Sequence, residues 1–241
     1  MKIKHGMILT AGLGKRMQPL TNKKPKPLLE IGGSTLLERA INLLINHGVE
    51  EITVNTHHLA NQIEKFISDF KSQAKIKISS EKDLLLDTGG GVKKGTKEFN
   101  DNPFFVINPD TLWSNKYSEE VQSLEKEYFT NKRPCLLLVK KALSLDNSFK
   151  GDFNLKNNLI SKDEKNQFIF TGLQIMKNDH LAFINKNIFS MNEVWTKLIN
   201  ENNLGGLESN QKFYHLNTIE MFEKISSLRP IAVSYTHLRA H

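Results

Sequence analysis

Strand-like and helix-like segments alternate along the chain, and this rhythm restricts the possible folds more than any other property of the sequence. Runs typical of strands are Ile3–Leu9, Glu51–Asn55, Lys75–Ser79, Phe104–Asn108, Cys135–Val139 and Phe168–Met176. Segments with apolar residues at helical spacing are Thr35–His47, Leu59–Phe70, Ser118–Phe129, Val194–Asn202 and Ile219–Leu228. Such alternation is typical of a mostly parallel sheet with helices on both faces, so we expect an α/β fold.

The length of 241 residues suits one such domain, and we expect a single domain over residues 1–228. Its first helix should begin after Ser34 as the N-cap and stop at Gly48. Residues 229–241 form a tail of doubtful origin that fits no element, and we assign it no function.

The net charge of +7 is concentrated near the start of the chain. Residues 1–30 hold seven cations against one acid, Glu30, which leaves a net +6 in this segment. A positive field beside a glycine turn favours a polyanionic ligand, most simply phosphates. Nucleic acid is the competing interpretation, and it is disfavoured because no aromatic residues interleave with these cations.

A glycine turn follows the first strand-like run. Gly12 and Gly14 let the backbone approach a ligand and turn its N–H groups towards it, and Lys15 and Arg16 add charge there. The turn matches neither the P-loop nor the dinucleotide fingerprint, whose last glycine position is occupied by Met17. By itself the turn is equally compatible with an ordinary strand-to-helix loop.

Lys26 lies between Pro25 and Pro27. Each proline restricts its own φ and the residue before it, so this lysine is held on a stiff backbone. A charge held in this way can neutralise a phosphate in a transition state with little reorganisation. The alternative is a solvated lysine in a proline turn.

Taken together, the two segments resemble a known signature. The pattern A-G-x-G-x-R-M-x-P-L-T over Ala11–Thr21, followed by P-K-P-L over Pro25–Leu28, resembles that of the sugar-1-phosphate nucleotidyltransferases. These enzymes make a nucleotide sugar and pyrophosphate from a nucleoside triphosphate and a sugar phosphate. The resemblance implies a Rossmann-like three-layer α/β/α sandwich with a mostly parallel mixed sheet, of the nucleotide-diphospho-sugar transferase type.

Downstream segments extend the resemblance. Asp87–Gly91 is similar to the family's T-G-G segment, whose backbone approaches the nucleobase. Asn108–Asp110 resembles the N-G-D that presents a metal-binding aspartate, with Pro109 in place of the glycine. Gly151–Leu155 and Phe170–Gln174 are similar to a narrower branch, the N-acetylmuramate-1-phosphate uridylyltransferases, with compact mannose-1-phosphate guanylyltransferase-like proteins as close relatives.

One departure affects the metal site. The family's late W-x-D-V-G-T segment supplies a second metal-binding aspartate, and here the corresponding stretch is Phe213–Thr218, with His215 in the place of the acid. Magnesium prefers oxygen ligands but often needs only one or two carboxylates at phosphates. Three outcomes are open: Asp110 and the triphosphate suffice, His215 favours a softer metal such as Mn²⁺, or the site is impaired.

The resemblance also implies individual roles. It implies catalysis by Arg16, Lys26 and Asp110. It implies nucleotide binding by Ala11, Gly12, Gly14, Lys15, Arg16, Lys26, Gly90 and Asn108. It implies sugar binding by Asp152, Thr171 and Gly172, and metal binding by Asp110 and His215. Mg²⁺ is the expected cofactor, with Mn²⁺ as the alternative.

The function we expect is transfer of a nucleotidyl group from UTP to N-acetylmuramate 1-phosphate. The alternatives are a mannose-1-phosphate guanylyltransferase and a non-catalytic nucleotide-sugar-binding regulatory module, the latter because of His215. The expected partners are a nucleoside triphosphate and a sugar 1-phosphate, with no nucleic acid and no membrane, in a monomer or a homodimer.

The single cysteine, Cys135, lies in an apolar run and permits neither an internal disulfide nor a cysteine-based zinc site, which fits a reducing compartment. The N-terminal stretch is too short and too broken by glycine and lysine for a secretory signal, and no run is long enough to span a bilayer. We therefore expect a cytoplasmic protein.

Overall fold

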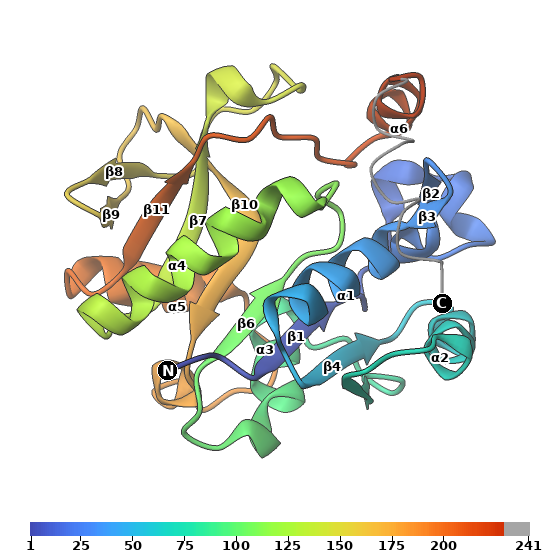
Figure 1. The fold of residues 1–241 in the computed structure, drawn as a ribbon, viewed down its shortest axis with the longest axis horizontal. Helices are drawn as coiled ribbons and strands as arrows, with labels where there is room; N and C mark the ends of the chain where they lie inside the picture. The colour runs from blue at the N-terminus through green and yellow to red at the C-terminus, as the bar shows by residue number, and fades with distance from the viewer. Residues whose placement is uncertain (229–241) are drawn as a thin grey trace.

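The computed structural model describes residues 1–228, so the tail at 229–241 lies outside the described residues. A nine-stranded sheet forms its centre (Figure 1). The strands are β1 (His5–Leu9), β4 (Glu51–Thr56), β5 (Lys75–Ser80), β6 (Phe104–Ile107), β7 (Cys135–Lys140), β8 (Asn154–Lys156), β9 (Leu159–Ser161), β10 (Phe168–Met176) and β11 (Gly205–Ser209). Their spatial order is β5-β4-β1-β6-β10-β7-β11-β9-β8.

The sheet is mixed but mostly parallel, as expected. Strand β1 pairs in parallel with β4 and β6, and β4 pairs in parallel with β5. Strand β10 runs antiparallel to both of its neighbours, β6 and β7, and β11 then continues in parallel with β7. The central strands are apolar on both faces because helices cover both sides of the sheet.

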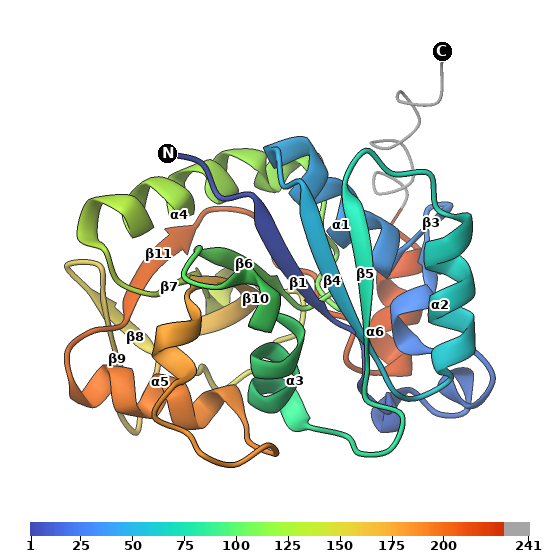
Figure 2. The ribbon, with the colours of Figure 1, turned by 90° about the horizontal axis from the view of Figure 1, so that it is seen from below.

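Helices pack on the two faces and complete the three layers. Figure 2 shows α1 (Leu36–His47) and α4 (Ser118–Asn131) on one side of the sheet, and α3 (Asp87–Gly95) and α5 (Met191–Asn200) on the other. Helix α2 (Ala60–Asp69) contributes Ile63 to the same apolar core as α1 and α4. Helix α6 (Ile219–Ser226) packs through Ile225 against Ile31 of the two-stranded β2 (Glu30–Ile31) and β3 (Ser34–Thr35) sheet.

Two predicted helix starts are corrected by the structure. The N-cap of α1 is Thr35, whose hydroxyl accepts a hydrogen bond from the Glu38 N–H at 3.0 Å, because Ser34 is paired in β3. Helix α5 begins at Met191, three residues before the expected start, because Ser190 accepts a hydrogen bond from the Asn192 N–H at 3.2 Å.

Several elements were not predicted, and glycine explains two of them. Helix α3 runs through three consecutive glycines, Gly89–Gly91, which have poor helix propensity. Strand β11 begins with Gly205 and Gly206, and a Cβ at Gly206 would lie 2.9 Å from side-chain atoms of Leu155 and Ile160. Close packing therefore requires glycine at positions where local propensity argues against a helix or a strand.

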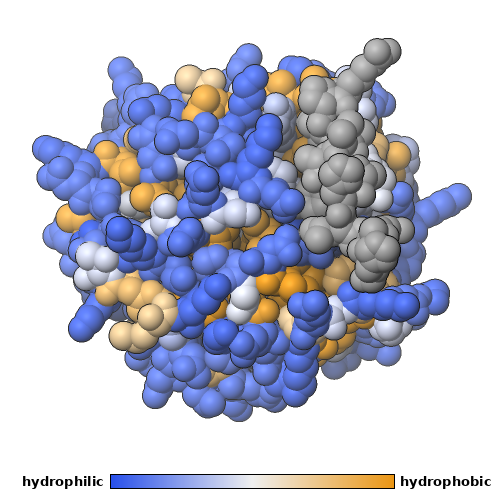
Figure 3. Space-filling model, in the orientation of Figure 1, coloured by the Kyte–Doolittle hydropathy of each residue, from blue (hydrophilic) through white to orange (hydrophobic). Residues whose placement is uncertain are grey.

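The surface in the view of Figure 3 is mostly hydrophilic, with apolar patches scattered among the charged side chains. The exposed large apolar residues are Met1, Leu20, Ile78, Leu84, Phe183 and Ile188. Among residues 1–228, no helix is both long enough and apolar enough to cross a bilayer.

The topology brings two loops to one edge of the sheet. Strand β1 ends at Leu9 before the glycine turn, and its neighbour β6 ends at Ile107 before Asn108–Asp110. Because the two strands are parallel and adjacent, their following loops lie side by side. The expectation that both loops follow the carboxyl ends of strands is confirmed.

Candidate active site

The glycine turn forms one wall of the site. Gly14 has φ +62°, and a Cβ there would lie 2.9 Å from the Thr21 methyl carbon. The Thr21 hydroxyl donates a hydrogen bond of 2.9 Å to the Gly14 carbonyl and holds the turn. A Cβ on Gly12 would meet nothing within 4 Å, so protein packing does not require glycine there. The open space beside Gly12 is what a close ligand would need.

Lys26 and Asp110 face each other across the site. The Lys26 Nζ atom lies 2.7 Å from Asp110 Oδ2, and the side chains are 15% and 24% exposed. Pro25 is extended with φ −63° and ψ 142°, and Lys26 opens a short 3-10 helix, Lys26–Leu28, whose Leu28 N–H donates to the Pro25 carbonyl at 2.9 Å. The lysine therefore projects from a constrained backbone.

The late segment reaches Asp110 through backbone pairing. His215 forms an antiparallel bridge with Thr111, and the Leu216 N–H donates to the Asp110 carbonyl at 2.8 Å. This pairing places His215 Nε2 at 3.2 Å from Asp110 Oδ2. The imidazole stacks on Phe213, with ring centroids 5.8 Å apart and an interplanar angle of 10°. His215 therefore contacts the carboxylate itself.

The charge state of Asp110 follows from these neighbours. Burial by itself would raise the pKa of the Asp110 carboxyl, but the charges and hydrogen bonds of Lys26 and His215 outweigh burial and hold it well below its usual range. Asp110 is therefore an anion at neutral pH.

Lys26 and Asp110 line one cavity of about 500 Å³, and His215 is not among its lining residues. Of the residues predicted to bind the nucleotide, the cavity is lined by Ala11, Gly12, Gly14, Lys15, Arg16, Lys26 and Asn108. Asp110, Asp87, Thr88, Asn55 and Asn217 also line it. The cavity thus combines a cationic glycine turn, one fixed lysine and the side chains of two aspartates, Asp87 and Asp110, and its cations suit a ligand with several phosphates.

A buried polar network ties the cavity to three strand ends. Asn55, at the end of β4, accepts a hydrogen bond from the Thr10 N–H at 2.7 Å and donates one of 2.7 Å to Glu81 Oε1. The other Glu81 oxygen accepts from the Leu86 N–H at 2.9 Å, just before α3. Because Glu81 is only 2% exposed, these bonds satisfy a carboxylate that would be costly to bury alone. The network holds the glycine turn and the start of α3 at fixed positions.

The fit to a divalent cation rests on one oxygen of Asp110. Asp110 Oδ1 is buried and has no hydrogen-bond partner among the described residues, whereas Oδ2 is occupied by Lys26 and His215. Within residues 1–228, no group of three or more His, Cys, Asp or Glu side chains could hold a metal by itself. Magnesium at phosphates can be held by one or two carboxylates, so the free oxygen fits such an ion. His215 Nε2 is engaged with the carboxylate, whereas its buried Nδ1 has no hydrogen-bond partner among the described residues, so metal binding by His215 stays a prediction.

The remaining predicted residues lie elsewhere. Gly90 is not among the residues that line this cavity: its N–H donates to the Phe189 carbonyl at 3.1 Å, and a Cβ there would lie 2.0 Å from the Asn187 carbonyl oxygen. The glycine is therefore required for packing of α3. Asp152 is exposed, and its Oδ2 accepts a hydrogen bond from the Phe170 N–H at 2.9 Å.

Thr171 and Gly172 form hydrogen bonds with backbone groups of Leu137 and Asn108. The Thr171 hydroxyl donates to the Leu137 carbonyl at 2.9 Å, and the residue is 1% exposed. The Gly172 carbonyl accepts from the Asn108 N–H at 2.8 Å, and its φ of +95° is a conformation that favours glycine. Neither residue lines the cavity, nor does Asp152, so their role in sugar binding stays a prediction.

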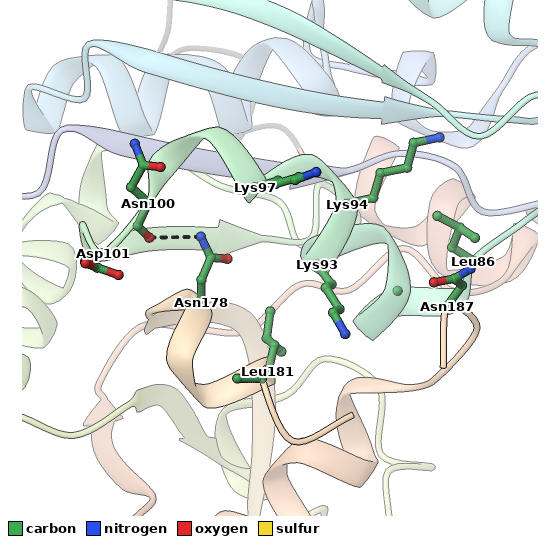
Figure 4. A pocket seen from close by; sticks show the side chains of 11 residues that line it. Leu86, Lys93, Lys94, Lys97, Asn100, Asp101, Asn178, Leu181 and Asn187 are labelled. Atoms are coloured by element: carbon green, nitrogen blue, oxygen red, sulfur yellow. Dashed lines mark hydrogen bonds between the residues drawn. The ribbon is translucent and has the colours of Figure 1, made fainter. Parts of the chain in front are cut away.

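A second cavity of about 700 Å³ lies beside the later turns of α3 (Figure 4). Lys93 points towards the segment that follows the 3-10 helix Asn178–Leu181, and its Nζ donates to the Ile184 carbonyl there. Lys94 Nζ donates to the Ser80 carbonyl. These two lysines are engaged with backbone oxygens, and the carboxylate in this wall, Asp101, is exposed. The larger cavity therefore lacks the convergent polar groups of the first.

Sequence reasoning missed several residues of the first cavity. Asn55 ends a strand-like run with a polar residue, and a buried polar residue at a strand end is a recognisable signal. Asp87 has φ +62°, a backbone conformation that residues other than glycine rarely adopt, and nothing in the sequence indicates this conformation. Asn217 lies within the segment that contains His215, two residues further on.

A cavity at the carboxyl ends of parallel strands, with a cationic glycine turn opposite a carboxylate, is typical of the ligand sites of α/β proteins that bind phosphates. The family model described as nucleotidyl transferase matches residues 5–138. The chain belongs to the nucleotidyl transferase family and is a nucleotidyltransferase, as the resemblance implied.

Curated proteins with similar sequences are also nucleotidyltransferases. The chain is 28% identical over 221 residues to an N-acetylmuramate alpha-1-phosphate uridylyltransferase of Caulobacter vibrioides, covering 88% of this chain and 91% of the relative. It is 32% identical over 117 residues to a mannose-1-phosphate guanyltransferase of Hypocrea jecorina, covering 47% of this chain and 32% of that protein.

Solved structures share the fold at low identity. A UDP-glucose pyrophosphorylase solved with UDP-glucose has a TM-score of 0.77 at 17% identity, over 93% of this chain and 97% of that one. The inositol-1-phosphate CTP transferase of T. maritima has a TM-score of 0.76 at 17% identity, over 94% and 98% of the two chains. The expected nucleotide-diphospho-sugar transferase fold is confirmed.

Proposed function

We propose that this protein makes a nucleoside diphosphate sugar and pyrophosphate from a nucleoside triphosphate and a sugar 1-phosphate, with UTP and N-acetylmuramate 1-phosphate as the substrates. The observation that carries the reaction class is the 2.7 Å pair of Lys26 and Asp110, set opposite the glycine turn in one cavity. The choice of substrates rests on the 28% identical uridylyltransferase, which matches most of both chains.

In the proposed reaction, an oxygen of the sugar phosphate attacks the α-phosphorus of the triphosphate, and pyrophosphate leaves in line. The protein has little covalent work to do, since its task is to position two polyanions and to stabilise their charge. The N–H groups around Gly12 and the side chains of Lys15 and Arg16 hold the leaving phosphates. Lys26 then lies at the reacting phosphate. Its ion pair with Asp110 keeps the ammonium group in position before the substrate binds.

Asp110 is the residue that would hold the divalent cation, through its free Oδ1 atom. When bound, Mg²⁺ screens the phosphate charges from one another and stabilises the charge that develops on the leaving oxygens. Mn²⁺ is the alternative ion. His215 keeps Asp110 Oδ2 occupied and fixes the orientation of the carboxylate.

Two other functions stay in competition. A mannose-1-phosphate guanylyltransferase is favoured by the 32% identity to such an enzyme over about half of this chain. A non-catalytic regulatory module is favoured by His215, which stands where the family pattern has an acid. We also propose that residues 1–228 form one catalytic domain, that the protein is cytoplasmic, and that it acts as a monomer or a homodimer.

Pyrophosphate release from the purified chain tests the proposal. UTP, GTP, CTP, dTTP and ATP are each combined with N-acetylmuramate, mannose, glucose and N-acetylglucosamine 1-phosphates, first with Mg²⁺ and then with Mn²⁺. Release that depends on UTP and N-acetylmuramate 1-phosphate is the expected result. Release with GTP and mannose 1-phosphate would select the first alternative. Nucleotide binding without release would select the regulatory module.

A further inference from the structure

Two buried side-chain oxygens in the first cavity have no hydrogen-bond partner among the described residues. They are Oδ1 of Asp110 and Oδ1 of Asn217. A buried acceptor left without a donor costs about 1–3 kcal/mol, so each such atom needs an explanation. Because both oxygens belong to residues that line one cavity, an electropositive ligand of that cavity would explain both.

The amide of Asn217 is oriented by a neighbour outside the cavity. Its Nδ2 group donates a hydrogen bond of 2.9 Å to Asp146 Oδ2. Asp146 Oδ1 accepts hydrogen bonds from the Ser148 N–H at 2.9 Å and from the Ser148 hydroxyl at 2.6 Å, so this side chain acts as an acceptor and the amide presents its nitrogen to it. The amide oxygen is thereby left as the unpaired group of Asn217.

The backbone places Asn217 on the same side of its segment as His215. The segment is extended where His215 bridges Thr111, and side chains two residues apart in such a segment share a face. Leu216, between them, points into an apolar cluster with Leu112. His215 reaches Asp110, and Asn217 reaches the same cavity.

The two positions differ together from the family pattern. In W-x-D-V-G-T, an acid occupies the position of His215 and a glycine occupies the position of Asn217. In this chain the position that usually supplies an oxygen has an imidazole, and the position that usually has no side chain carries an amide oxygen. The oxygen lost at one position is therefore matched by an oxygen gained two residues later.

We propose that Asn217 Oδ1 is the second protein ligand of the divalent cation held at Asp110 Oδ1. This inference rests on the proposed function, because that function supplies the cation and the phosphates that complete its coordination. Magnesium and manganese both accept neutral carbonyl oxygens, and Mg²⁺ at phosphates takes one or two protein ligands. His215 acts in this arrangement as the donor that holds Asp110 Oδ2, and Asp146 is the residue that positions the Asn217 amide.

The test is a Mn²⁺ titration of the purified chain, followed by the electron paramagnetic resonance of free Mn²⁺, without nucleotide and with saturating UTP. Asn217→Ala is expected to weaken Mn²⁺ binding by about 10-fold, the scale observed when a partner of a metal site is removed. Asn217→Asp is expected to strengthen it, because a carboxylate replaces a neutral amide. The matched control is Asn178→Ala, whose amide oxygen already accepts from the Thr96 hydroxyl at 2.7 Å and whose loss should leave Mn²⁺ binding unchanged.

A second pair of variants separates ligation from a loss of folding. His215→Asp restores the family's acid, so in that background Asn217→Ala should cost much less Mn²⁺ affinity than in the parent. Equal losses in the two backgrounds, or no loss in either, would overturn the proposal, as would a parent chain that binds no Mn²⁺ under either condition. Thermal unfolding of each variant verifies that it is folded.

The inference and the proposed function fail in different ways. If the chain releases pyrophosphate and its Mn²⁺ affinity does not change in the Asn217 variants, Asn217 is rejected as a ligand and the proposed reaction is retained. A Mn²⁺ affinity that responds to Asn217, in a chain that releases no pyrophosphate with any substrate pair, would retain the ligand and reject the reaction.

Discussion

Helix α3 contributes to two cavities, and the smaller of the two is the candidate active site. Its first residues, Asp87 and Thr88, line the cavity of about 500 Å³ with Lys26 and Asp110. Its later turns line the cavity of about 700 Å³ with Lys93 and other lysines. The cavities differ in how far their polar atoms are satisfied. In the larger one Lys93 donates to a backbone carbonyl, whereas in the smaller one two buried oxygens have no partner among the described residues.

This difference shows that neither volume nor the presence of lysines identifies a site in this fold. At the larger cavity, Lys93 and Lys94 donate to the backbone carbonyls of Ile184 and Ser80. At the smaller cavity, Lys15 and Arg16 lie on a glycine turn, and Lys26, on a proline-bounded segment, pairs with Asp110. Unsatisfied polar groups at strand ends are the more informative signal.

The largest effect is expected for variants of the candidate active site. Lys26→Ala or Asp110→Asn should lower the turnover of pyrophosphate release at least ~10²-fold, about 2.7 kcal/mol, because each removes a preorganised charge at the reacting phosphate. Lys93→Ala, in the wall of the larger cavity, is the matched control and should leave turnover unchanged. Near-normal activity of a folded Lys26 or Asp110 variant would remove that residue from the mechanism.

The next prediction concerns the stability of helix α3. Gly90→Ala should lower the free energy of unfolding by about 2 kcal/mol, although alanine normally stabilises a helix relative to glycine by about 1 kcal/mol. The reason is that a Cβ at this position would lie 2.0 Å from the Asn187 carbonyl oxygen. Urea denaturation of the variant and the parent measures the change, and a stabilised Gly90→Ala variant would contradict the packing role.

Gly12→Ala should leave the stability of the fold nearly unchanged and weaken the binding of the nucleotide. A Cβ at Gly12 meets no atom within 4 Å, so the free energy of unfolding should stay within about 0.5 kcal/mol of the parent. The added methyl would project into space that the triphosphate needs, and we expect UTP to bind about 5- to 10-fold more weakly, roughly 1 kcal/mol. Calorimetric titration with UTP checks this result. Unchanged affinity would show that the ligand does not approach Gly12.

The last prediction concerns the dependence of stability on pH. The pKa of Asp110 is depressed in the folded protein by Lys26 and His215, so its ionised form stabilises the fold above the pKa of the unfolded chain, 3.8. This contribution should be lost progressively as the pH falls below about 4. Asp110→Asn should therefore be less stable than the parent by about 1–2 kcal/mol at pH 7, and the difference should shrink at pH 3. Urea denaturation at both pH values measures it, and a constant difference would contradict the ionised pairing.

Much of the architecture was predictable because it depends on local periodicity. Strand β6 and helix α4 were predicted to within about two residues at each end, since long apolar runs and helical spacing are strong signals. Helix α3 and strand β11 were not predicted, since each contains consecutive glycines whose presence is explained by the neighbours they pack against. Local propensity cannot report a close approach between segments far apart in the sequence.

Some residues of the candidate site were predicted from the sequence, and others were not. Gly12, Gly14, Lys15, Arg16, Lys26 and Asp110 were predicted from three short segments, Ala11–Thr21, Pro25–Leu28 and Asn108–Asp110, and all line the cavity. Gly90 was predicted for the nucleotide, but the cavity does not include it. Asn55 and Asn217 were missed, because the position of each depends on pairing with a distant segment.

The sequence by itself determined the α/β class, the placement of the cationic turn after the first strand, and the family, because these depend on periodicity and on contiguous motifs. The tertiary structure decided which charges meet. The 2.7 Å pair of Lys26 and Asp110 joins residues far apart in the chain, and the pairing of His215 with Thr111 brings an imidazole to the same carboxylate. Only a folded sheet places these segments together, since its parallel strands bring distant loops to one edge.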